Sequence, residues 1–92
     1  MANLHISYDL REPGRNYDKV SKCIKSLGSW AKIHESFWYV KSPLTADEAV
    51  AKITAVLDAN DLVYVVDASS NHAAWNALPP PVTGHLQASW LL

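Results

Sequence analysis

Asp9 places a carboxylate at the end of an alternating run that extends from Leu4 to Leu10. In a strand the side chains point to alternate faces, so the apolar residues of this run share one face. The opposite face carries His5, Ser7 and Asp9. In a small apolar domain, such a row of polar groups marks a candidate site for chemistry. The same pattern also fits a purely structural role, because antiparallel sheets often have one hydrated face and Asp favours strand ends.

The chemistry open to Asp9 is the binding of a hard divalent cation. Mg²⁺ prefers oxygen ligands and often takes only one or two carboxylates, with water and phosphate completing its shell. One Asp9 is a poor site, whereas two copies across a dimer axis could hold Mg²⁺ and activate water against a phosphodiester. The sequence has no Gly-rich phosphate loop, no nucleophile elbow and no paired cysteines, and its four histidines lack zinc spacing.

Positive charge is concentrated in the first half of the chain. The net charge is −1, but residues 1–41 carry seven of the eight Lys and Arg side chains against four acids, whereas residues 42–92 carry one against five. This basic cluster could face nucleic-acid phosphates, or it could be an ordinary solvated helix face. Its members include Arg11, Arg15, Lys19 and Lys22.

Length and composition limit the classes of protein to consider. The 92 residues fit one domain that buries about 60 to 65% of its unfolded surface, so a partner subunit is expected to add stability. No apolar stretch reaches the roughly 18 residues that span a bilayer, and no membrane partner is expected. The start lacks a basic and apolar signal region, and Cys23 is the single cysteine. These features predict a cytoplasmic protein.

The hydrophobic pattern predicts four strands and two helices before a tail. After the first strand, a Pro-Gly turn leads into a helix over residues 17–27, which Gly28 ends. A second helix begins at Thr45, which forms a capping box with Glu48. A fourth strand is expected over residues 61–67. The two middle strands are expected at Trp30–His34 and Ser36–Lys41.

The order β-α-β-β-α-β predicts an α+β fold of the ferredoxin-like type, an antiparallel four-stranded sheet with the first strand in its middle. The helices can cover only one face of such a sheet. The third and fourth strands carry apolar residues on both of their faces, so a second subunit or the tail is expected to cover the face that the helices leave open. A homodimer with facing sheets would bring the two Asp9 residues near its two-fold axis.

Residues 69–92 are predicted to extend a ferredoxin-like domain at residues 1–68 and to pack on the body or on a partner subunit. A short helix could start at Ser70 or Asn71 and end before the run of three prolines, which predicts an extended linker. Residues 83–92 fit either a last helix or an added strand. The tail tryptophans that are expected to dock are Trp75 and Trp90.

Short motifs on these elements resemble those of one protein superfamily. The strand end ISYDL, the basic first helix, the segment His34–Trp38 and the element order are similar to those of the CRISPR-associated Cas-two proteins and the virulence-associated protein D ribonucleases. The stretches YDLREPGRNYD and WAKIHESFWYVKS resemble most the SinR-type group of this superfamily. The resemblance covers roughly residues 3–68.

The resemblance implies a homodimer of ferredoxin-like subunits with facing sheets. It also implies a metal-dependent nuclease centre that uses the Asp at the end of the first strand, which is Asp9 in this chain. The family's Ser-aromatic segment corresponds to the segment that begins at Ser36, and its phosphate-contacting basic residues correspond to Arg11 and Arg15.

Three functions follow as hypotheses. The first is a Mg²⁺-dependent endonuclease, acting on RNA, in which Asp9 is the metal ligand and catalytic residue together with Ser36. The second is a non-catalytic dimer that binds RNA, DNA or a protein through the basic half. The third is a small-molecule regulatory domain, because this fold hosts many functions. The expected nucleic-acid contacts come from Arg11, Arg15, Lys19 and Lys22.

Overall fold

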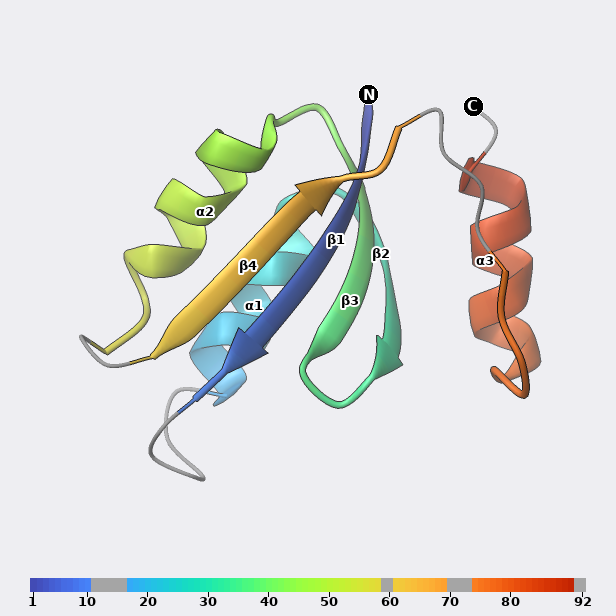
Figure 1. Ribbon diagram of the computed structural model, residues 1–92, viewed down its shortest axis with the longest axis horizontal. Helices are drawn as coiled ribbons and strands as arrows, with labels where there is room; N and C mark the ends of the chain where they lie inside the picture. Colours follow the sequence, from blue (N-terminus) through green and yellow to red (C-terminus); the bar gives the residue numbers. More distant parts are fainter. Residues whose placement is uncertain (11–16, 59–60, 70–73, 91–92) are drawn as a thin grey trace.

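The computed structural model describes residues 1–10, 17–58, 61–69 and 74–90. These residues form four strands and three helices in the order β-α-β-β-α-β-α (Figure 1). The strands are β1 Ala2–Asp9, β2 Ser29–His34, β3 Phe37–Ser42 and β4 Leu62–Asp67. The helices are α1 Tyr17–Ser26, α2 Ala46–Thr54 and α3 Pro80–Trp90. None of these three helices is long and apolar enough to cross a bilayer.

The sheet is antiparallel, with the strand order β2-β3-β1-β4. The predicted ferredoxin-like α+β fold, with the first strand in the middle of the sheet, is therefore confirmed. Ile6 of β1 lies opposite Trp38 of β3 on one side and Val65 of β4 on the other. Opposed residues of neighbouring strands point to the same face. We call the face that carries Ile6 the inner face and the face that carries Asp9 the outer face.

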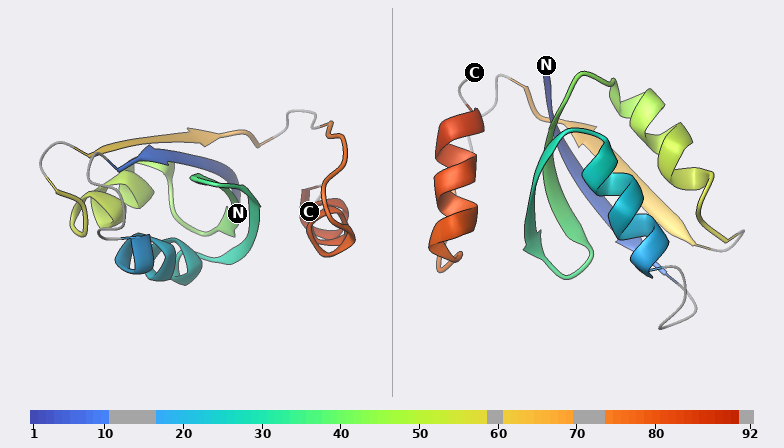
Figure 2. Two further views of the ribbon diagram at one scale, coloured as in Figure 1. Left: turned by 90° about the horizontal axis from the view of Figure 1, so that it is seen from below. Right: turned by 180° about the vertical axis from the view of Figure 1, so that it is seen from behind.

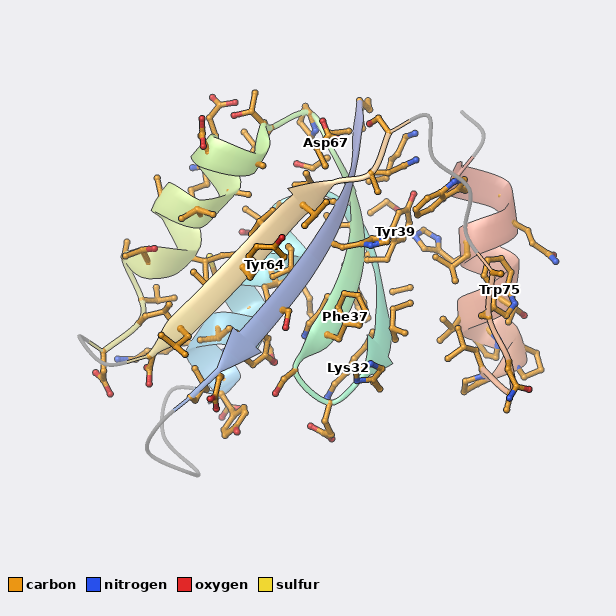
Figure 3. The ribbon with its side chains drawn as sticks, in the orientation of Figure 1. Lys32, Phe37, Tyr39, Tyr64, Asp67 and Trp75 are labelled. Carbon is orange, nitrogen blue, oxygen red and sulfur yellow. The ribbon has the colours of Figure 1, made fainter. Side chains whose placement is uncertain are left out.

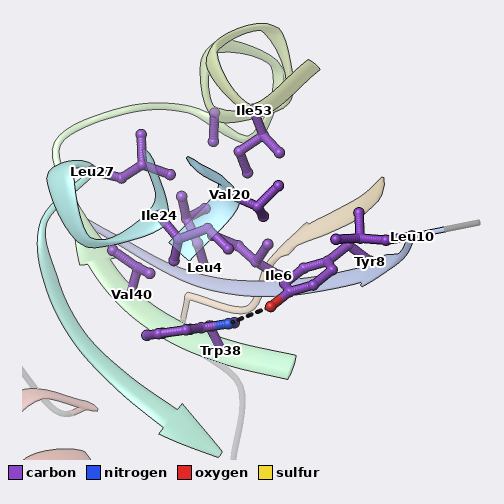
Figure 4. Packing of buried hydrophobic residues seen from close by; sticks show 11 residues of the cluster. Leu4, Ile6, Tyr8, Leu10, Val20, Ile24, Leu27, Trp38, Val40 and Ile53 are labelled. Carbon is purple, nitrogen blue, oxygen red and sulfur yellow. Dashed lines mark hydrogen bonds between the residues drawn. The ribbon is translucent and has the colours of Figure 1, made fainter. Parts of the chain in front are cut away.

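Helices α1 and α2 both cover the inner face (Figure 2). The main core lies between these helices and the sheet (Figure 4). Its fully buried members include Leu4, Ile6, Val20, Ile24 and Ile53. Trp38 Nε1 donates a hydrogen bond to Tyr8 Oη at 3.2 Å, so both polar aromatic groups have a partner inside the core. Each large apolar side chain buried here contributes about 1.5 to 3 kcal/mol, so this layer holds the domain together.

Helix α2 begins with the predicted capping box. The Thr45 amide donates to Glu48 Oε1 at 2.9 Å, and the Glu48 amide donates to Thr45 Oγ1 at 3.1 Å. Two backbone amides that a helix start leaves free are thereby satisfied. Ala49 and Ile53 of this helix are buried against the sheet.

Gly28 joins α1 to β2 where the chain passes the backbone of β3. A Cβ atom built on Gly28 would collide with the carbonyl oxygen of Lys41 and lie 3.0 Å from Ser42 Cα. The Ser42 hydroxyl donates to the Leu27 carbonyl at 2.6 Å and holds the same crossing. The glycine therefore has a steric cause: the two backbones approach too closely for a side chain to fit.

The tail corrects two predictions. The proline run is predicted to be an extended linker, but α3 begins at Pro80 and includes Pro81. Proline fits the first turn of a helix because the amide hydrogen that it lacks has no intrahelical partner there. The predicted short helix is wrong for residues 74–78, which are not helical, and its earlier part lies outside the described residues. For the last segment, the helix alternative is confirmed as far as Trp90.

Helix α3 lies beside β2 (Figure 2). It contacts Ala31 and Tyr39, which the strand register places on the outer face of the sheet. Leu86 of α3 is buried with Ala31 of β2 and Tyr39 of β3 in a second, smaller cluster. The tail thus covers part of the outer face, which is one of the two coverings expected from the sequence. At the opposite edge, on β4, the Leu62 and Tyr64 side chains stay exposed.

A polar network joins the end of α3 to β1. Asn3 Oδ1 accepts hydrogen bonds from Tyr39 Oη at 2.8 Å and from Lys41 Nζ at 3.2 Å. Asn3 Nδ2 donates to the Trp90 carbonyl at 3.0 Å. Buried polar groups need such partners, so the network fixes where the tail helix ends. The docking of Trp90 on the body confirms the prediction for this tryptophan.

Candidate functional site

Asp9 ends β1 on the outer face, opposite Leu62 of β4, and its side chain is exposed. The alternating pattern therefore predicts its face correctly. No group of three or more His, Cys, Asp or Glu side chains that could hold a metal ion occurs in the described part of the chain. A cation bound by Asp9 would need further ligands from water, from a substrate phosphate or from a second subunit.

Ser36 lies in the short turn between β2 and β3. Its φ of 63° is in the left-handed region, which costs a residue with a side chain about 1 to 2 kcal/mol. The Tyr8 amide donates to the Ser36 carbonyl at 3.1 Å and fixes the turn beside the end of β1. The structure thus brings Ser36 and Asp9, the two predicted catalytic residues, to the same end of the sheet.

A hollow of about 350 Å³ opens on the outer face beside Ser36. Phe37 of β3 and Tyr64 of β4 both project on this face (Figure 3). The other lining residues are His5, Ser7, His34, Glu35, Ser36 and Val66. Asp9 is not part of the lining. The hollow combines aromatic surface with imidazoles, hydroxyls and one carboxylate, so it can hold an organic group by packing and hydrogen bonds.

His5 is half-buried among aromatic rings. Its ring centroid lies 5.7 Å from that of Phe37 and 5.3 Å from that of Trp90. Burial lowers the pKa of His5 below its ordinary value of 6.5, because an apolar setting disfavours the charged imidazolium. The imidazole is therefore neutral near pH 7, and it offers one donor and one acceptor to whatever enters the hollow.

Two of the four predicted nucleic-acid contacts, Lys19 and Lys22, lie on a different layer from Asp9. Lys19 and Lys22 are exposed on α1, which covers the inner face. Arg11 and Arg15 lie outside the described residues. The structure therefore does not bring the two lysines onto the face that carries Asp9. A nucleic acid that touched both would have to pass around an edge of the sheet.

Sequence reasoning singled out neither His34 nor Tyr64 as a residue that lines the hollow beside Ser36. They come from β2 and β4, which are separated by two other strands in the sheet. Tyr64 lies opposite Ser7 of β1, so the strand register places it at the hollow. The sequence did contain a signal for Tyr64. Apolar residues occupy both alternating sets of positions in β4, so one of the two sets had to point away from the helices.

No protein-family model and no curated protein matches the chain. Its function therefore has to be inferred from the residues and their geometry. Two features of the outer face serve this inference: the exposed Asp9 carboxylate at the end of β1, and the neighbouring hollow that His5 and Ser36 line.

Proposed function

We propose that the protein is a homodimer of Cas-two-like subunits that acts as a Mg²⁺-dependent endonuclease on RNA, with Asp9 of each subunit as metal ligand. The observation that carries this proposal is the position of Asp9, which is exposed at the end of β1, beside the Ser36 turn and on the face that α1 and α2 leave open. The resemblance of the ISYDL motif supports the same role for Asp9.

The proposal requires two copies of the chain. One Asp9 supplies a single carboxylate, and the described residues hold no cluster of three metal-binding side chains that could complete a shell. Two Asp9 carboxylates across a two-fold axis, with water and phosphate oxygens, match the ligands that Mg²⁺ prefers. Facing outer surfaces would also cover Tyr64, whose side chain is 70% exposed in one chain.

Mg²⁺, Asp9 and Ser36 would each have a separate role in the proposed reaction. When bound, Mg²⁺ would supply a Lewis acid that activates water and neutralises charge on the phosphate. Asp9 would hold the cation at the end of β1. The Ser36 carbonyl already accepts the Tyr8 amide, so its hydroxyl would be the group that orients a phosphate or a metal-bound water.

Cleavage of RNA by Asp9→Asn protein tests the proposal. Changes next to a metal ligand typically cost 10 to 100-fold, so loss of the ligand itself should lower Mg²⁺-dependent cleavage by at least about 100-fold. Asp47→Asn is the matched control, because Asp47 is an exposed Asp on α2, which covers the inner face. Cleavage that is equal in the Asp9→Asn and wild-type proteins would show that another site or a contaminant is responsible.

A second candidate is a non-catalytic dimer that binds nucleic acid or a protein. The observation that favours it is the hollow, which lies beside Asp9 yet is rich in aromatic rings and lacks the Asp9 carboxylate. Titration calorimetry with Mg²⁺ distinguishes the two candidates. A stable dimer that takes up no Mg²⁺, with or without RNA, supports the non-catalytic module.

A further inference from the structure

Trp30 is a partly exposed tryptophan on the edge strand β2. Its relative exposure is 42%, and its ring packs against Trp38 with ring centroids 5.4 Å apart. Lys25 Nζ, from α1, lies 4.7 Å from the centre of the Trp30 ring. Lys32 Nζ, from β2, lies 5.7 Å from the Trp38 ring centre. Two ammonium groups thus flank a pair of indole rings at one edge of the domain.

Positive charge extends from this edge along α1. Lys19, Lys22 and Lys25 are all exposed and follow one another at a spacing of three residues. Lys32 has an acidic neighbour in Glu35, at 3.7 Å, but the Glu35 side chain is 88% exposed, so this ion pair is well screened. An exposed aromatic ring among lysines is the combination that binds single-stranded nucleic acid, since bases stack on the ring and phosphates pair with the ammonium groups.

We propose that Trp30, Lys25 and Lys32, which we call the Trp30 edge, bind single-stranded RNA with one base stacked on Trp30. This inference deepens the proposed function and rests on it, because RNA is the substrate proposed there. Trp30 lies opposite Val40 and therefore belongs to the inner side of the sheet. The Trp30 edge stays accessible when two outer faces meet in a dimer.

A base can replace Lys25 at the Trp30 ring. A cation over an exposed indole is held more weakly than a stacked base, so stacking wins the competition for the ring face. The displaced Lys25 remains tethered to α1 and can pair with the adjoining phosphate. Trp38 is 2% exposed and donates a hydrogen bond to Tyr8, so it gives the Trp30 ring a rigid surface to pack on.

Trp75 provides the matched comparison. It is 38% exposed, similar to Trp30, but it lies in the tail beside α3 (Figure 3). Within the described part of the chain, no lysine lies over its ring. The two indoles are therefore exposed to a similar degree, and only the Trp30 edge adds the positive charge that binding of a polyanion requires.

The test measures binding of an oligouridine of about ten nucleotides, a length within the site sizes of single-strand binders, to the full chain at low salt in EDTA. The Trp30→Ala and Trp75→Ala variants both also carry Asp9→Asn, so cleavage of the RNA does not interfere. Trp30→Ala should weaken binding by about 5 to 150-fold, and Trp75→Ala should leave it unchanged. Circular dichroism confirms that each variant is folded.

The Lys25→Gln and Lys32→Gln variants keep the Trp30 ring in place, and they test the inference if Trp30→Ala does not fold. Each should reduce the slope of log affinity against log salt by about 0.7. Equal affinities of Trp30→Ala and Trp75→Ala, unchanged salt slopes, or absence of binding would overturn the inference. Trp30-dependent binding by a wild-type protein that never cleaves RNA supports the Trp30 edge as a binding site and rejects the nuclease.

Discussion

His5 and Asp9 are two polar residues of one strand face that end in different surroundings. Asp9 is exposed at the end of β1, where a metal ion or a second chain can reach it. His5 lies closer to the tail helix, with its ring 5.3 Å from that of Trp90. Alternation in the sequence treats the two residues alike. The difference between them arises because α3 covers one part of the outer face and leaves the rest open.

The lowered pKa of His5 predicts a pH dependence of stability. The unfolded chain binds a proton at His5 near pH 6.5, whereas the folded chain binds it only at lower pH. As the pH falls through 6.5, the unfolded state therefore gains more protons, and the free energy of unfolding decreases. Thermal melts between pH 7.5 and 5 measure this loss. In a His5→Gln variant the melting temperature should fall less over this range, and an equal fall would show that other groups cause it.

At the scale of elements, Gly28 and Gly84 have opposite surroundings and lead to opposite predictions. Gly28→Ala forces a Cβ into the Lys41 carbonyl and should destabilise the protein by several kcal/mol, about as much as severe overpacking of a core. Gly84 lies inside α3, and a Cβ atom added there would meet nothing within 4 Å, so Gly84→Ala should stabilise by about 0.5 to 1 kcal/mol. Urea denaturation of both variants measures these changes. Similar effects of the two substitutions would contradict the close approach at Gly28.

Local signals in the sequence were sufficient to predict the secondary structure of the ferredoxin-like part of the chain. The capping box at Thr45 and the period-two run that ends at Asp9 each depend on residues close together in sequence, and both are confirmed. The proline run failed as a predictor because proline suits an extended segment and a first helical turn equally well. What selects the helix is burial of Leu86 against β2 and β3, a contact between distant segments.

The candidate site was only partly predictable for the same reason. The sequence suggested Asp9 as a candidate through its strand pattern and Ser36 through the family resemblance, and the strand register brings both to one end of the sheet. The hollow beside them is lined by side chains from all four strands or their ends, and Tyr64 is one of these. No local pattern shows which residues of β4 lie beside β1, because that pairing depends on the order of strands in the finished sheet.

At the scale of the whole molecule, the sheet separates two kinds of surface. The α1 side carries exposed lysines and Trp30, whereas the β4 side of the outer face carries exposed apolar side chains. Contiguous apolar surface on a small domain favours association, and lysines favour a polyanion. The two proposed partners would therefore not compete for one surface, since a second subunit would lie on the outer face and RNA at the Trp30 edge.

A dimer through the outer face predicts a mass of about twice the 10.2 kDa of the chain in solution. Tyr64→Glu should shift this dimer towards the monomer, because it places a charge on the exposed apolar surface that a second subunit would cover. Gln87→Glu adds the same charge on an exposed part of α3 and should leave the mass unchanged. Light scattering coupled to gel filtration, over a range of protein concentrations, measures all three proteins. A wild-type monomer at every concentration would leave each Asp9 without its second copy and would exclude the paired metal site.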